Sequence, residues 1–267
     1  MGKNVSFGLN GFNVKRDANN TNFDETRTGI SISFAKSLSE LIKAGIGFTG
    51  EQVKLTDVPA TAGPDVLAFK GNTNLGRVKF TISRDSRNNV FNPGRGSVIS
   101  GATEFIGGDE TYYNGQLSFS KYFTLFKKHI LEAKTRLGVT DTIGGNKVPV
   151  FDRFYAGGLG TVRGYGPRSI GPQQGGGSVG GDTIFILNLE YTIPIIESFK
   201  GAVFMDFGDV SAGSFALDND SFAASVGPGL KINTPIGPVA LYYGVPFYHP
   251  DPENENGRFE FSFSRGF

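Results

Sequence analysis

The sequence predicts an all-β fold, a transmembrane antiparallel β-barrel of about twelve strands that takes up residues 1–267 as a single domain. Composition points there first, because 39 Gly, 25 Phe and 9 Tyr accompany a mean hydropathy of -0.16, with no Trp and no Cys. Apolar and polar residues also alternate with period two from end to end, in segments of roughly 9–11 residues, the length of a tilted membrane strand. No apolar run approaches the roughly 18 residues of a membrane-spanning helix.

The expected strands follow one another along the chain in an even number, as in bacterial outer-membrane barrels. The early strands carry apolar rows of one parity: Val5, Phe7 and Leu9; Ile30, Ile32 and Phe34; Val78, Phe80 and Ile82; Leu117 and Phe119. We expect strands to begin near residues 4, 27, 43, 76, 97, 112, 130, 183, 201, 222, 238 and 258.

The central strands place charged residues opposite their apolar rows. In HILEAKTRLGV the polar row holds both signs of charge, with Glu132, Lys134 and Arg136, as a wet interior would. Glu190 in ILNLEYTI and Asp206 in VFMDFGDV also fall on the polar side of their strands. Because successive side chains of a strand point to opposite faces, we expect both carboxylates to face the lumen.

The last segment, GRFEFSFSRGF, alternates most clearly. Its aromatic row consists of Phe259, Phe261, Phe263 and Phe267, and its polar row of Glu260, Ser262, Ser264 and Gly266. The pattern predicts the last strand of the barrel. In a cell with the matching assembly machine, the same strand would also act as a signal, read by strand addition at an exposed edge.

Connections and aromatic residues support a membrane barrel over a soluble one. Short turns, such as residues 234–238, alternate with longer loops, such as Thr56–Asp65 and Thr140–Gly181. A soluble β-sandwich or soluble barrel also alternates, but its outer faces usually carry more charge than the Ser, Gly, Asn and Thr rows of this chain. Aromatic residues near the expected strand ends fit interfacial girdles: Tyr112, Tyr113, Tyr122, Phe123, Tyr242, Tyr243, Phe247 and Tyr248.

Charge and motif content exclude several classes of function. A net charge of +1 argues against a nucleic-acid binder, which usually has a strong basic excess. No zinc-ligand spacing, nucleophile elbow or phosphate loop is found, so we expect no enzyme, no metal and no cofactor. The first ten residues, MGKNVSFGLN, lack the apolar core of a signal peptide. If the protein is exported, we expect this chain to be a mature fragment or a segment with an added Met.

One glycine-rich stretch stands out, FDRFYAGGLGTVRGYGPRSIGP (Phe151–Pro172). It places Arg163 between Val162 and Gly164, in the motif Val162, Arg163, Gly164 and Tyr165. Glycines let a backbone turn sharply or approach another backbone closely. From the residues alone, Arg163 is either a solvated arginine in a flexible loop or a cation held inside the barrel.

Taken with its neighbours, this motif resembles the C-terminal barrel of the BamA-like family of bacterial outer-membrane assembly factors, whose superfamily carries a VRGF/Y loop. TISRDSRNNVFNPGRGS (Thr81–Ser97), LNLEY, FMDFGDV and the terminal strand are also similar to that family. The resemblance implies that the loop folds into the lumen, that Arg163 pairs with Glu190 and Asp206, and that Val162 and Tyr165 pack on the interior. A guanidinium suits this role, because its planar fork bridges two carboxylates.

The chain departs from the family at its N-terminus. The family barrel has sixteen strands and is preceded by POTRA domains, whereas about twelve strands and no POTRA domain are expected here. In the family, the first and last strands meet at a weak seam that opens toward lipid and templates a substrate strand. An open edge in lipid would leave backbone groups unpaired, at several kcal/mol each. We therefore expect closure, by pairing of the segment near Asn4–Lys15 with Arg258–Phe267 or by a second chain.

The resemblance implies an outer-membrane barrel derived from a factor that folds and inserts other outer-membrane proteins. Its partners would be the lipid bilayer, unfolded outer-membrane proteins and other subunits of the assembly machine, and its location the bacterial outer membrane. Two alternatives stay open: a truncated or engineered barrel that is only a passive pore or scaffold, and a relative that secretes polypeptide through its lumen.

Overall fold

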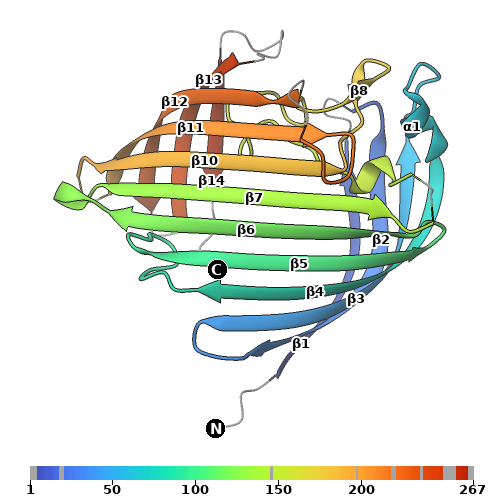
Figure 1. Ribbon diagram of the computed structural model, residues 1–267, viewed down its shortest axis with the longest axis horizontal. Helices are drawn as coiled ribbons and strands as arrows, with labels where there is room; N and C mark the ends of the chain where they lie inside the picture. The colour runs from blue at the N-terminus through green and yellow to red at the C-terminus, as the bar shows by residue number, and fades with distance from the viewer. Residues whose placement is uncertain are drawn as a thin grey trace.

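The computed structural model describes residues 5–17, 21–144, 147–196, 198–217, 221–234, 237–248 and 257–263. Twelve strands form one antiparallel sheet whose order follows the chain (Figure 1). They are β1 (Val5–Arg16), β2 (Asp24–Ser37), β3 (Ile42–Thr56), β4 (Gly71–Asp85), β5 (Gly96–Gly108), β6 (Tyr112–Thr124), β7 (Ile130–Thr142), β10 (Thr183–Pro194), β11 (Phe199–Ser211), β12 (Ala223–Thr234), β13 (Gly237–Tyr248) and β14 (Arg258–Phe263).

The predicted fold class is confirmed, and the strand starts agree closely. The largest difference is at β4, which was expected from residue 76 and begins at Gly71. Between the strands lie α1 (Pro64–Ala68), two 3-10 turns, η1 (Phe126–Lys128) and η2 (Val150–Asp152), and a hairpin of β8 (Gln173–Gln174) and β9 (Gly177–Ser178). None of the described helices is long and apolar enough to cross a membrane.

The sheet curls around a lumen and turns its apolar rows outward. Phe7 is 63% exposed and Leu9 66% exposed, although both are large apolar side chains. On the inner face, Asp206 has no exposed surface and Glu190 is 7% exposed. An apolar outer wall around a charged interior is the reverse of a soluble domain and is what a bilayer covers.

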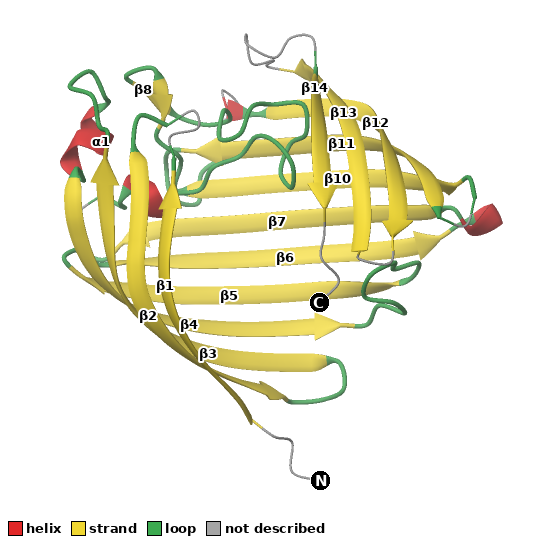
Figure 2. Ribbon diagram, turned by 180° about the vertical axis from the view of Figure 1, so that it is seen from behind, coloured by secondary structure: helices red, strands yellow, loops and turns green. Residues whose placement is uncertain are grey.

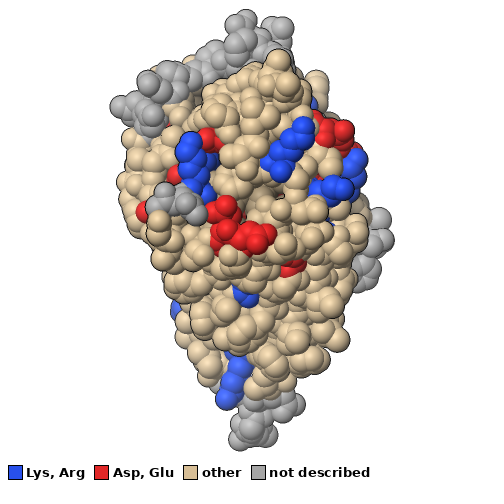
Figure 3. Space-filling view, turned by 90° about the vertical axis from the view of Figure 1, so that its right-hand side faces the viewer, with Lys and Arg blue, Asp and Glu red and all other residues tan. Residues whose placement is uncertain are grey.

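The two ends of the barrel differ. One end, here called the loop end, carries α1, the β8–β9 hairpin and the longest connections, whereas the strands are joined by shorter connections at the other end (Figure 1). Figure 3 views the loop end, where acidic and basic side chains gather over the upper part of the face. Charged side chains of this kind suit an end that projects out of the hydrocarbon.

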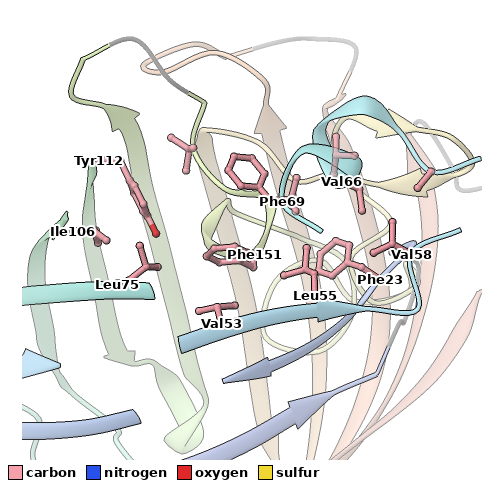
Figure 4. Packing of buried hydrophobic residues seen from close by; sticks show 14 residues of the cluster. Phe23, Val53, Leu55, Val58, Val66, Phe69, Leu75, Ile106, Tyr112 and Phe151 are labelled. Carbon is pink, nitrogen blue, oxygen red and sulfur yellow. The ribbon is translucent and has the colours of Figure 1, made fainter. Parts of the chain in front are cut away.

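An apolar cluster sits inside the loop end (Figure 4). It joins the ends of β3 and β4 to α1 and to Phe151 of the connection between β7 and β10. The rings of Phe69 and Phe151 meet edge to face, with centroids 6.2 Å apart. The fully buried members, such as Phe23 and Val53, fasten this connection to the first third of the sheet.

The two edge strands of the sheet, β1 and β14, are not paired with each other in the described part of the chain. The expected pairing of residues 4–15 with residues 258–267 is therefore not formed by the residues that the structure describes; Asn4 and residues 264–267, Phe267 among them, lie outside these. Figure 2 shows the interior loops between the two edges. An open edge in lipid is costly, so each edge strand needs a hydrogen-bonding partner. This cost does not determine which strand the partner is, whereas the strand registers determine where each edge lies.

The predicted girdle is partly wrong. Tyr112, Tyr122 and Tyr242 are buried on the inner side, at 1%, 9% and 7% exposure. These tyrosines belong to pairs of consecutive aromatic residues, and consecutive residues of a strand point to opposite faces. Only one member of each pair can therefore reach the lipid, as Phe123 does next to Tyr122.

Candidate functional site

The connection from β7 to β10 folds back into the lumen instead of projecting outward (Figure 2). We call residues 147–182 the lumen loop. Its tip is the motif Val162, Arg163, Gly164 and Tyr165, and every residue of this motif is buried. Gly164 has φ of +90°, a conformation that only glycine adopts without strain.

Arg163 at the tip contacts both carboxylates that the sequence placed on the lumen face. Its Nη1 donates to Oε2 of Glu190 at 2.7 Å. Its Nε and Nη2 donate to the two oxygens of Asp206 at 2.7 and 2.8 Å, and its backbone N–H adds a third bond to Asp206, at 3.0 Å. This bidentate pairing fixes the guanidinium in direction as well as in position.

The surroundings of Arg163 complete the charge balance. Lys231 of β12 bonds to the other oxygen of Glu190, so two cations face two carboxylates. Asn188 donates to Asp206 at 2.9 Å. The guanidinium carbon lies 3.6 Å from the ring centroid of Phe204 and 4.6 Å from that of Tyr242. Burial of the group is thus matched by hydrogen bonds and by aromatic faces, as a buried ion requires.

The other residues of the tip pack against the wall. Val162 is fully buried in an apolar cluster with Ile186 and Val210. The Tyr165 hydroxyl donates to the carbonyl oxygens of Ala224 and Tyr248.

The tip also touches the last two strands, which sequence reasoning did not foresee. The N–H of Gly164 donates to Oε1 of Glu260 on β14 at 2.8 Å. A Cβ on Gly244 of β13 would lie 2.5 Å from the nitrogen of Gly164, so two glycines are needed for this approach. The signal was present: Glu260 is the acid on the inner face of its strand, as Glu190 and Asp206 are on theirs.

A second set of ion pairs holds the start of the lumen loop, with the charges reversed. Here the loop supplies the acid, Asp152, and the wall supplies the cations. Arg27 of β2 donates to Asp152 Oδ1 at 2.8 Å, and Arg77 of β4 and the Tyr112 hydroxyl also bind this carboxylate. Arg77 in turn donates to Glu51 at 2.6 Å. No sequence motif marks this cluster, because its members are scattered over residues 27–152.

A third contact lies at the loop end and joins the lumen loop to α1. Asp65 accepts hydrogen bonds from Lys147 at 2.6 Å and from Arg153 at 2.8 Å. Burial disfavours the charge on Asp65, but the two cations outweigh it and hold the pKa of Asp65 below its usual range. Asp182, at the end of the loop, has the opposite balance: burial raises its pKa to about 6, although Arg153 lies near.

The aromatic row of the last strand points away from the lumen. Phe259, Phe261 and Phe263 are 69%, 64% and 44% exposed, whereas Glu260 between them is buried.

Two polar cavities lie beside the lumen loop, one of about 500 Å³ next to Arg27 and Arg77 and one of about 230 Å³ next to Arg163. One cavity thus borders the start of the loop and the other its tip, and each is large enough to hold water.

The curled antiparallel sheet with an arginine-tipped loop inside it agrees with the known proteins to which the chain is similar. The Omp85 superfamily domain matches residues 1–267. The chain belongs to the Omp85 superfamily. Over 259 residues, 92% of the chain, it is 32% identical to the outer membrane protein assembly factor BamA of Nitratidesulfovibrio vulgaris, and it covers 32% of that protein. The resemblance inferred from the sequence is therefore confirmed.

Two further relatives extend the comparison. The SAM50-like protein SPAC17C9.06 of Schizosaccharomyces pombe is 24% identical over 80% of this Omp85 chain and 48% of its own length. The crystal structure of BamA from Haemophilus ducreyi lacking POTRA domains 1–3 has the same fold, with a TM-score of 0.81 at 21% identity, over 96% of this chain and 57% of that one. The chain spans a third to a half of the length of these curated relatives.

Proposed function

We propose that this chain is the membrane-barrel part of a factor that folds and inserts other β-barrel proteins in the bacterial outer membrane. The similarity to an outer membrane protein assembly factor over nearly the whole chain supports this. The observation that carries it is structural: the sheet ends on two strands, β1 and β14, that do not pair with each other in the described part.

An unpaired edge strand is a template for another strand. In hydrocarbon each unpaired N–H or C=O group costs several kcal/mol, so an unfolded strand cannot enter lipid alone. The edge of β14 offers a ladder of backbone partners, which removes that cost as the strand enters. The reaction consists of hydrogen bonding and burial, and we propose no covalent step, metal or cofactor. The partners are then unfolded outer-membrane proteins, the bilayer and other subunits of an assembly machine.

The folding rate of an unfolded outer-membrane protein in liposomes containing this chain tests the proposal. Matched liposomes with an unrelated, fully closed barrel are the control, because any barrel perturbs the bilayer. Faster folding than in the control supports an assembly factor. Equal rates would contradict it and leave the alternative of a passive pore or scaffold.

A further inference from the structure

We propose that Glu260 is a positioning residue that couples the lumen loop to the edge strand β14. The proposal rests on the proposed function, since the placement of this edge matters to a protein that acts on other strands. It goes further by naming the contact inside the barrel that sets the edge.

The edge strand has one neighbouring strand among the described residues. The described part of β14 is six residues long and pairs along one side only, with β13. A short strand with one neighbour is held weakly and frays more easily than a strand with two. The aromatic side chains of β14 face outward. The lumen loop can therefore hold β14 only through the side chains on its inner face.

Burying the carboxylate of Glu260 costs free energy, so a role limited to packing the inner face would not explain this residue. Its side chain is buried, and Oε2 has no hydrogen-bond partner among the described residues. A buried carboxylate with an unsatisfied oxygen costs free energy that an apolar residue would not cost. What the carboxylate gains is the hydrogen bond at 2.8 Å from the N–H of Gly164.

The donor of that bond is itself fixed. Gly164 follows Arg163, whose side chain and backbone together donate four hydrogen bonds to Glu190 and Asp206. On its other side Gly164 lies against Gly244 of β13. The peptide N–H is therefore a rigid reference point, joined to β10 and β11, from which β14 takes its position.

The far end of the lumen loop extends the same connection across the barrel. Asp152 is bonded to Arg27 on β2, the neighbour of the other edge strand β1. The loop thus runs from the wall next to one edge to the other edge itself. A shift of the loop would move β14 relative to β1.

The test uses the full chain in liposomes and two substitutions of the same residue. Glu260→Leu removes the acceptor, whereas Glu260→Gln keeps an oxygen that can accept from Gly164. Ser262→Ala is the matched control, because Ser262 is on the same strand and the same inner face and has no hydrogen bond from its side chain among those described. Hydrogen exchange of residues 257–263 and the folding rate of an added outer-membrane protein are both measured.

We expect Glu260→Leu to speed hydrogen exchange in β14 roughly tenfold, since a hydrogen bond to a charged group is lost. It should also slow the assisted folding, while Glu260→Gln and Ser262→Ala behave as the parent. Unchanged exchange in Glu260→Leu would overturn the coupling. Faster exchange with unchanged assisted folding would overturn the positioning role.

Failure of the proposed function gives a different result. If the parent itself does not accelerate folding, the exchange data still decide whether Glu260 holds β14. Should Glu260→Leu fail to fold, exchange in Asp152→Asn tests the same connection from the far end of the loop, and protection of β14 equal to that of the parent would contradict it.

Discussion

Arg163 is held inside the barrel by charge balance and geometry together. Its guanidinium donates to Glu190 and Asp206, which also accept from Lys231 and Asn188, respectively. The faces of Phe204 and Tyr242 cover the guanidinium plane. Removing one member of such a cluster leaves the others buried and unpaired, which costs more than the contact itself contributes. Comparing the removal of Arg163 with its replacement by lysine therefore separates the role of the charge from that of the guanidinium geometry.

Arg163→Ala is expected to lower the free energy of unfolding by about 3–5 kcal/mol, because Asp206 stays buried without its cation. Arg163→Lys should recover only part of this, since an ammonium cannot bridge two carboxylates in the same plane. Denaturant unfolding in liposomes measures both variants, and proteolysis reports release of the lumen loop. The control is Arg168→Ala, which removes a half-buried arginine of the same loop that stacks on Tyr155. An effect of Arg163→Ala no larger than this control would show that the cluster is not structural.

Asp182 makes the anchoring of the loop depend on pH. Burial raises its pKa to about 6, above the value near 3.9 of an unfolded aspartate. Because the folded pKa is raised, the stabilisation by the protonated form is complete below about pH 4 and is lost as the pH rises through 6. Asp182→Asn cannot become charged, so it should be more stable than the parent at pH 8 and equal to it at pH 4. Thermal unfolding of both proteins at the two pH values checks this, and a difference of the same size at both would contradict it.

At the scale of elements, the lumen loop is a strut with anchors at both ends rather than a flexible cover. Its tip binds the last third of the sheet through Arg163 and Gly164, and its start binds the first third through Asp152 and Phe151. The loop supplies a cation at its tip and a carboxylate at its start. Neither part of the loop could therefore bind at the other's site on the wall.

Asp152→Ala should release the start of the loop. The free energy of unfolding is expected to fall by about 3 kcal/mol, because Arg27 and Arg77 lose the carboxylate that they share. Trypsin cleavage at Lys147 or Arg153 should become faster. Glu40→Ala, which removes an exposed acid from a turn, is the control. Unchanged cleavage would mean that the apolar cluster around Phe151 is the anchor by itself.

The strands and the tip motif could be predicted from the sequence because both depend on local patterns. Period-two alternation places Glu190 and Asp206 on the lumen face whatever the register, and the glycines mark the loop. The second anchor could not be predicted, because Arg27, Arg77 and Asp152 come together only through the curvature of the sheet. The prediction that the buried tyrosines face the lipid was wrong for a simpler reason. It used their position near a strand end but not their place in the alternation, which decides the face of the sheet on which a ring lies.

At the scale of the whole molecule, the chain is a membrane-type sheet whose two edges face each other across the lumen loop. Ladder hydrogen bonds hold every inner strand on both sides, whereas β1 and β14 are each paired on one side within the described residues. A closed barrel would have no such strands. Within the described residues, the lumen loop therefore links parts of the wall that strand pairing does not connect. At one end it contacts β14, the edge strand that we propose to be active.

The most direct measurement is photo-crosslinking from the wall to an outer-membrane protein while it folds. A photo-crosslinking phenylalanine analogue replaces Phe259 on the edge strand β14 or, as the matched control, Phe105 on β5 within the wall; both side chains are exposed on the outer face, at 69% and 49%. The proposed function predicts strong crosslinks from position 259 and few from position 105. Equal crosslinking from both positions would mean that the folding protein meets the wall at random and that the edge has no special role.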